Sequence, residues 1–63
     1  MNEGERLVDL DFVAAYLSLP KSSLYRLTSA YRIPHIKIGS LLRFRLSEID
    51  EWLESKQRGG ADV

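Results

Sequence analysis

The stretch KSSLYRLTSAYRIPHIKIGSLLRFR, residues 21–45, decides how the chain folds and what it can bind. It holds six basic side chains and no aspartate or glutamate. The whole chain has nine basic and nine acidic residues, so the rest of it carries three basic against nine acidic side chains. This sorting predicts one cationic surface on a neutral protein, and such a surface fits an anionic partner.

Length and composition exclude several classes of protein. Sixty-three residues form one small domain, and a chain of this size buries only roughly 60% of its unfolded surface. With no catalytic motif in the sequence either, we do not expect an enzyme. The absence of cysteine excludes disulfides and thiolate ligands for zinc. No apolar run approaches the roughly 20 residues of a membrane span, so we expect a cytoplasmic protein without cofactor, metal or membrane partner.

Two short helices joined by a tight turn are predicted before the hairpin. Apolar residues recur at helical spacing after Asp9, a good N-cap, and predict a first helix that stops before Pro20. The apolar stripe of this helix is Leu10, Val13, Ala14 and Leu17. Pro20 also suits the first turn of a second helix, which has Leu24 and Leu27 on one edge. The opposite face of that helix carries Ser22, Tyr25, Arg26 and Ser29. The gap of about three residues between the helices is typical of a helix-turn-helix unit.

The segments HIKI and LLRFR alternate in polarity and predict a β-hairpin that turns at Gly39-Ser40. A two-residue turn would pair Ile36 with Arg43 and mix the apolar and polar faces. A three-residue loop aligns the apolar residues of both strands on one face, so we predict that register. It places Lys37 opposite Arg43, which is unfavourable unless an anion lies between the two cations.

A last helix is predicted to begin at Ser47, which together with Asp50 resembles a capping box with aspartate in place of glutamate. Its apolar residues are Leu46, Ile49, Trp52 and Leu53, and its acidic residues are Glu48, Asp50, Glu51 and Glu54. We expect residues 1–6 to form a flexible leader, residues 7–56 the folded domain and residues 57–63 a flexible tail.

The chain from Leu7 to about Leu53 resembles the excisionase-type, MerR-like winged helix-turn-helix domains. The pieces that carry the resemblance are KSSLYRL, IPHIKIG, the RF after the turn and the closing IDEWL, in this order and spacing. Pro20 stands where the family often has a serine or threonine N-cap, and Tyr31 where many members have a glycine. The resemblance implies a mainly α fold with a small β-hairpin, the wing.

The charge pattern predicts DNA binding independently of this resemblance. Neutralising the phosphates of B-DNA releases counterions, a helix enters the major groove, and a hairpin can lie on the flanking backbone or in the minor groove. We therefore expect sequence-specific binding of double-stranded DNA, with the acidic residues of the first and last helices facing away. The expected DNA-binding residues are Lys21, Ser22, Ser23, Tyr25, Arg26, Lys37, Gly39, Ser40, Arg43 and Arg45.

Three questions about partners stay open at this point. The protein could act as an excisionase-like recombination directionality factor with a recombinase, or as a small transcriptional regulator with a polymerase. An alternative from another class is a protein-interaction adaptor whose basic face binds an acidic protein. Because acidic helices flank the basic stretch, head-to-tail self-association on tandem DNA sites is also expected, with Leu41 at the wing tip as an apolar contact.

Overall fold

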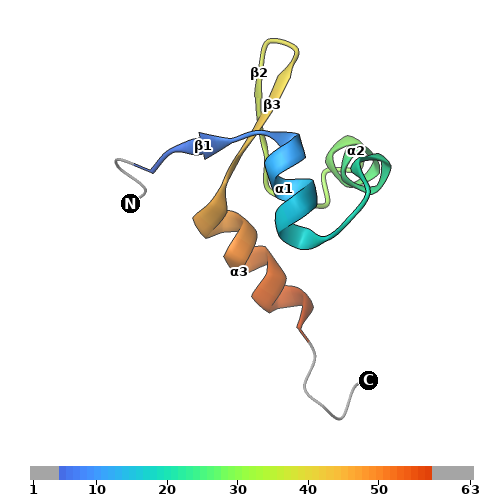
Figure 1. Ribbon diagram of the computed structural model, residues 1–63, viewed down its shortest axis with the longest axis vertical. Coiled ribbons are helices and arrows are strands. Elements are labelled where there is room, and N and C mark those ends of the chain that lie inside the picture. Colours follow the sequence, from blue (N-terminus) through green and yellow to red (C-terminus); the bar gives the residue numbers. More distant parts are fainter. Residues whose placement is uncertain (1–4, 58–63) are drawn as a thin grey trace.

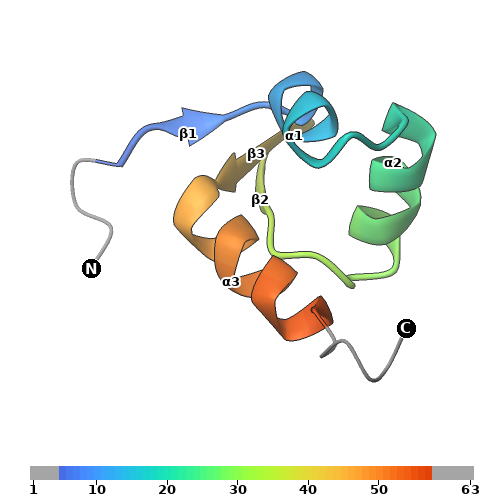
Figure 2. The same cartoon turned by 60° about the horizontal axis from the view of Figure 1, so that its bottom comes forward.

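The computed structural model describes residues 5–57, which form three helices and three short strands (Figure 1). In chain order these are β1 (Leu7–Val8), α1 (Leu10–Leu17), α2 (Lys21–Ser29), β2 (Ile36–Ile38), β3 (Leu41–Arg45) and α3 (Leu46–Lys56). The β2–β3 hairpin projects from the helices, and the views place α2 and α3 on different sides of the molecule (Figures 1 and 2). This arrangement confirms the predicted winged helix-turn-helix fold.

The helix-turn-helix unit forms from local signals in the sequence. The Asp9 carboxylate accepts a hydrogen bond of 2.9 Å from the backbone N–H of Phe12, so Asp9 caps α1 as predicted. Helix α1 ends at Leu17, and its C-cap residue, Ser18, adopts the left-handed conformation with φ 57°. The backbone N–H of Leu19 then bonds to Ala14 O at 2.9 Å, and Pro20 starts α2 as its N-cap residue. The turn between the helices is therefore only three residues long.

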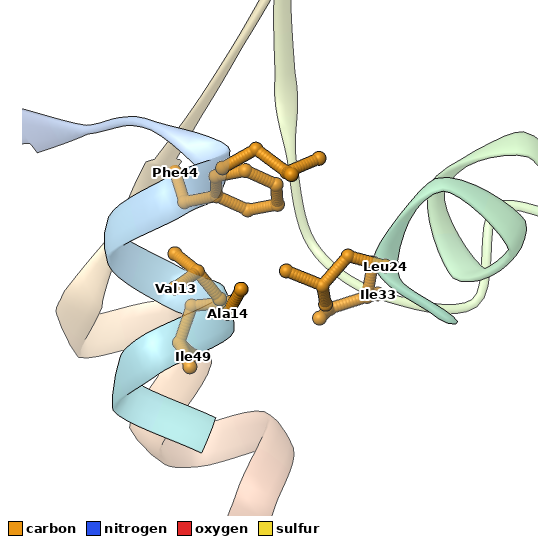
Figure 3. Close-up of a cluster of buried hydrophobic side chains, with 7 residues drawn as sticks. Val13, Ala14, Leu24, Ile33, Phe44 and Ile49 are labelled. Carbon is orange, nitrogen blue, oxygen red and sulfur yellow. The ribbon is translucent and has the colours of Figure 1, made fainter. Parts of the chain in front are cut away.

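The core is small and draws on all three helices and the central strand (Figure 3). Val13 of α1, Leu24 of α2, Phe44 of β3 and Ile49 of α3 have no exposed surface. Burying one such side chain contributes about 1.5–3 kcal/mol. Leu10, Ala14 and Ile33 complete the buried cluster. Partly buried apolar side chains, among them Leu17, Leu27 and Trp52, pack against this cluster and complete the core.

The sheet contains a strand that the sequence analysis did not predict. Its order is β1-β3-β2, and β1 pairs antiparallel with β3 so that Leu7 faces Arg45 and Val8 faces Phe44. A two-residue strand is too short to show the alternation by which strands are recognised. The pairing anchors the chain just before α1 to the base of the wing. The predicted leader and tail lie mostly outside the described residues.

The predicted hairpin register is wrong. The strands pair Ile36 with Arg43, Lys37 with Leu42 and Ile38 with Leu41, so the turn has two residues. Gly39 takes φ 61° at the first turn position, as in a type II′ turn, which favours glycine there. The three-residue prediction assumed that a core covers all the apolar residues of the hairpin. The wing tip has no such cover, because the side chains of Ile38 and Leu41 are 52% and 53% exposed.

Because of this register, the two faces of the wing carry different residues. Because directly paired residues project to the same side of a sheet, the inner face carries Lys37 with Leu42 and Phe44. The outer face carries the remaining residues of both strands, Ile36, Ile38, Leu41, Arg43 and Arg45. Lys37 and Arg43 therefore project to opposite sides, and the predicted pair of facing cations does not exist.

Helix α3 is not capped as the sequence predicted. It starts at Leu46, with Arg45 as an N-cap residue that makes no side-chain capping bond. The carboxylate of Glu5 instead accepts hydrogen bonds from the backbone N–H of Ser47 at 2.8 Å and from its hydroxyl at 2.9 Å. Asp50, the other member of the predicted capping box, accepts a bond of 2.6 Å from the Tyr16 hydroxyl. Both residues of that box thus bind distant parts of the chain.

These bonds lower the pKa of Glu5 from its ordinary value of 4.5, first through the backbone N–H of Ser47 and then through its hydroxyl. A group whose pKa is lowered by folding stabilises the fold fully above its unfolded pKa, and this contribution disappears as the pH falls through the folded pKa. The stabilisation is therefore present above pH 4.5 and is lost progressively as the pH falls from there through the lowered pKa of Glu5 in the folded protein.

Replacing Glu5 with Gln should lower the melting temperature at neutral pH and leave little difference from the parent in strong acid. Thermal unfolding followed by circular dichroism between pH 7 and pH 2 measures this. The variant Glu54→Gln removes one exposed carboxylate from α3, the helix that contains Ser47, and serves as the control. A Glu5→Gln profile parallel to that of the parent over the whole range would show that the Ser47 contact contributes nothing.

Candidate nucleic-acid interface

The exposed face of α2 is the side opposite to its buried edge. Leu24 and Thr28 are buried, and the Thr28 hydroxyl donates a 3.0 Å bond to the carbonyl of Tyr25. Tyr25 is 56% exposed, and no carboxylate of the described residues lies within ion-pair distance of the exposed Arg26. The outward face consists of Ser22, Tyr25, Arg26 and Ser29. It combines hydroxyls, an aromatic ring and a guanidinium, which are groups able to contact base edges and phosphates.

The first turn of α2 offers backbone donors and a lysine. Its N-cap residue, Pro20, makes no side-chain hydrogen bond to the helix, and Lys21 and Ser22 are exposed while Ser23 is half-buried. The first N–H groups of a helix have no partner within the helix, and the helix dipole favours an anion near them. These three predicted residues therefore lie together at one end of the exposed face.

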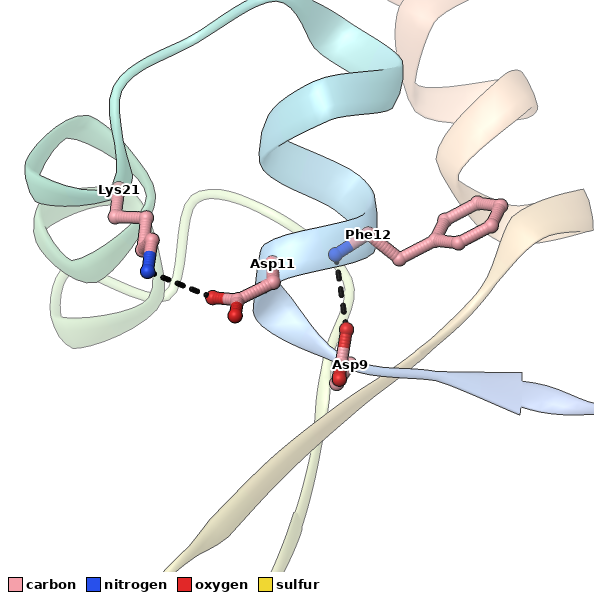
Figure 4. Close-up of polar contacts among 4 residues, drawn as sticks. All are labelled: Asp9, Asp11, Phe12 and Lys21. Carbon is pink, nitrogen blue, oxygen red and sulfur yellow. Dashed lines mark hydrogen bonds and ion pairs between the residues drawn. The ribbon is translucent and has the colours of Figure 1, made fainter.

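Lys21 already has a partner on the neighbouring helix. Its ammonium lies 3.1 Å from a carboxylate oxygen of Asp11 (Figure 4), and both side chains are mostly exposed. The Phe12 ring points away from this contact (Figure 4). An exposed ion pair contributes only about 0–1 kcal/mol to stability, so a phosphate can compete for the lysine.

The acidic residues of the first helix were expected to face away from the DNA-binding surface, but the two at the start of α1 do not. Asp9 and Asp11 line a hollow together with Tyr25 of α2 and with Ser40 and Arg43 of the wing. The negative charge of Asp11 therefore lies at the edge of the cationic surface. The acidic residues of α3 line no part of this hollow or of the groove beside it.

A groove separates α2 from the inner face of the wing. Its lining residues are Tyr25, Thr28, Ser29, Tyr31, His35, Lys37, Ser40 and Leu42. No acidic side chain is among them. Three predicted residues meet here: Tyr25 from α2, and Lys37 and Ser40 from the wing. The groove is therefore the place where the two predicted binding elements face each other.

Two predicted arginines lie outside this groove. Arg43 is half-buried on the outer face of the wing, where its guanidinium donates a 2.7 Å bond to the carbonyl of Leu42. Arg45 lies at the base of the wing opposite Leu7, where its charge also helps to lower the pKa of Glu5, after the Ser47 hydrogen bonds. Gly39 is exposed at the wing tip and lines neither the hollow nor the groove.

Five lining residues of the groove are not among the expected DNA-binding residues, and two of these, Tyr31 and His35, carry aromatic rings. The alternating pattern predicted His35 to lie in a strand. Tyr31 was noted only because it stands where many members of the family have a glycine. Neither signal identifies a groove, because the groove exists only once the wing packs beside α2.

Within residues 5–57, no group of three or more histidine, aspartate or glutamate side chains could hold a metal ion. None of the helices in this part of the chain is long and apolar enough to cross a membrane.

Comparison with known proteins gives one match. A family model described as a helix-turn-helix domain matches residues 7–57, which is most of the chain and includes all the elements described above. No curated protein and no solved structure matches the chain significantly.

The Lys21–Asp11 pair generates a prediction for any polyanion. The variant Asp11→Asn releases Lys21 and removes a negative charge beside the groove, so it should elute from immobilised heparin at higher salt than the parent. The control Glu54→Gln makes the same change in net charge on α3, away from the groove, and should shift the elution much less. Equal shifts for the two variants would show that only net charge matters and that the surface has no local specificity for anions.

Proposed function

The chain belongs to the helix-turn-helix domain family, and on this premise we propose that it binds double-stranded DNA sequence-specifically, with α2 as the recognition helix. The major groove of B-DNA is wide enough for one α-helix, and the exposed face of α2 is the face that would enter it. The wing then lies on the flanking backbone or in the minor groove. The helix-turn-helix family is typically non-enzymatic, and this function needs no catalysis.

The observation that carries the proposal is the acid-free groove between α2 and the wing. Lys37 projects into it from one side and Tyr25 from the other, so a phosphodiester strand could contact both elements at once. Arg26 is exposed on α2 and has no carboxylate partner within residues 5–57, so its guanidinium is available to a guanine edge or a phosphate.

We propose two biological roles for such binding: an excisionase-like recombination directionality factor, or a small transcriptional regulator. The resemblance of the chain to the excisionase-type, MerR-like domains supports both. A recombinase partner fits the first role, and an RNA polymerase fits the second. Either role places the protein in the cytoplasm and on the nucleoid when bound. Immunoprecipitation of bound chromosomal DNA distinguishes them, since the sites would lie beside recombination sites or beside promoters.

A random-site selection with the purified protein tests DNA binding itself. We expect an enriched sequence motif and an affinity that falls linearly with the logarithm of salt concentration. A protein-interaction adaptor, the competing function, would show no enriched motif and no log-linear salt dependence with DNA. It would instead bind an acidic protein through its basic face.

Arg26→Ala should weaken binding to the selected site by about 1–3 kcal/mol and relax the preference at one base position, if the guanidinium reads a guanine edge. Lys21→Ala is the matched comparison from the same helix. It should weaken binding to all sequences more evenly, as loss of a phosphate contact does. Fluorescence anisotropy with the selected duplex and with single-base variants measures both effects. Unchanged affinity of Arg26→Ala for the selected site would remove Arg26 from the interface.

Self-association on DNA is a separate proposal. The acidic helix α3 of one copy could approach the wing of the next, where Ile38 and Leu41 form an exposed apolar pair at the tip. Such a head-to-tail contact does not close and can extend along repeated sites. Because an exposed ion pair contributes only about 0–1 kcal/mol, the contact should register only when DNA raises the effective concentration.

A binding isotherm on two adjacent sites should therefore show positive coupling for the parent and reduced coupling for the double variant Glu51→Lys/Glu54→Lys. Single-site affinity must be measured alongside, because the added lysines also attract DNA. Independent filling of the two sites by the parent, or full coupling in the variant, would contradict head-to-tail assembly.

A further inference from the structure

Tyr31 has a backbone conformation that does not suit its side chain. Its φ is 56°, in the left-handed region where a Cβ is crowded and where glycine is accommodated without strain. Backbone bonds at the end of α2 hold this conformation, because the N–H of Tyr31 bonds to Thr28 O at 3.0 Å and that of Arg32 to Leu27 O at 2.8 Å. A helix commonly ends in this way, and glycine is its usual residue at such a position.

The side chain of Tyr31 gains nothing from the core that would offset this strain. It is 85% exposed, more than any other large apolar or aromatic side chain of the described residues. Burial therefore gives no reason for a tyrosine here. A strained, exposed residue of this kind suggests a role in binding rather than in folding.

The ring of Tyr31 nevertheless makes an aromatic contact. It lies against the ring of His35, with 5.8 Å between the centroids and 31° between the planes. The His35 ring is itself fixed by a 2.8 Å hydrogen bond between its Nδ1 and the carbonyl of Ile33. Because a carbonyl oxygen can only accept, Nδ1 carries the hydrogen. His35 thus braces Tyr31 at the side of the groove.

The groove gives this tyrosine suitable neighbours. Tyr25 and Lys37 line the same groove, which has no acidic lining residue. A phosphodiester strand has alternating phosphate and apolar sugar faces. Lys37 provides the cation for a phosphate, and the tyrosines provide ring faces for sugars and hydroxyl donors for phosphate oxygens. The other hollow beside α2 contains Asp9 and Asp11, which would repel the same strand.

We propose that Tyr31, braced by His35, is a DNA-backbone contact that clamps the strand passing between α2 and the wing. The phenol hydroxyl donates to a phosphate oxygen, and the ring packs on the adjacent deoxyribose. This inference rests on the proposed DNA binding and adds a contact residue at the C-terminal end of the recognition helix. Because the contact is to the backbone, it strengthens binding to all duplexes and does not select a sequence.

Two variants test the contact without breaking the backbone conformation. Tyr31→Gly and Tyr31→Asn both accept positive φ, so each should melt at or above the temperature of the parent. Both should bind the selected duplex and a scrambled duplex about ten- to a hundredfold more weakly than the parent, the size expected for a lost hydrogen bond to a charged group. Since tyrosine is uncharged, the salt dependence of binding should not change, in contrast to that of Lys37→Ala.

Ser18→Gly is the matched control. Ser18 has nearly the same φ, 57°, at the end of α1, and it lines neither the groove nor the hollow beside it. This variant should gain stability in the same way and bind DNA as tightly as the parent.

Three results would overturn the inference. If the parent binds DNA and both Tyr31 variants bind equally well, the clamp is wrong while the DNA-binding function stands. If both variants melt well below the parent, the ring has a structural role and the argument from strain fails. If the parent binds no duplex in the same assay, the proposed function fails and the clamp fails with it.

Discussion

The burial of Phe44 is the interaction on which the rest of the structure depends. Phe44 lies on β3, the strand that pairs with both β1 and β2 and leads directly into α3. Its side chain has no exposed surface and belongs to the same cluster as Leu24 of α2. The wing therefore keeps a fixed position beside the recognition helix. Truncating a buried phenylalanine costs about 3–5 kcal/mol, a large fraction of the stability of a domain this small. Loss of this contact would therefore abolish the groove, although Phe44 is not one of its lining residues.

The features that could be predicted from the sequence are those whose signals are local. Asp9 caps the helix that follows it, and Pro20 ends one helix region and begins the next. The failures are non-local. The cap on Ser47 comes from Glu5, 42 positions away, which no local pattern reveals. The hairpin register failed because apolar alternation indicates a buried face only where a core covers it, whereas the two-residue turn at Gly39 leaves the tip uncovered.

The sequence indicates that the candidate site is rich in basic residues, but it indicates less about how those residues are arranged. The basic stretch lacks acidic residues, and this led us to expect Lys37 and Tyr25 among the DNA-binding residues; in the structure both line one groove. The sequence could not show that Asp11 of the preceding helix reaches Lys21, because that contact depends on how α1 packs against α2. It also could not show that Tyr31 lines the groove. The basic side chains are therefore less concentrated on the folded surface than the sequence suggests: Lys37 lines the groove, whereas Arg43 and Arg45 lie outside it.

The central claim is that α2 and the inner face of the wing bind one duplex together. Titrating isotopically labelled protein with its selected duplex, and following the backbone amide resonances by NMR, tests this most directly. If α2 and the wing bind one duplex together, the largest shifts occur in the first turns of α2, near Tyr31 and around Lys37, and the exposed side of α3 is little affected. Shifts confined to α3 and to the Phe12–Tyr16 side of α1 would contradict it, because the ligand would then bind away from the groove.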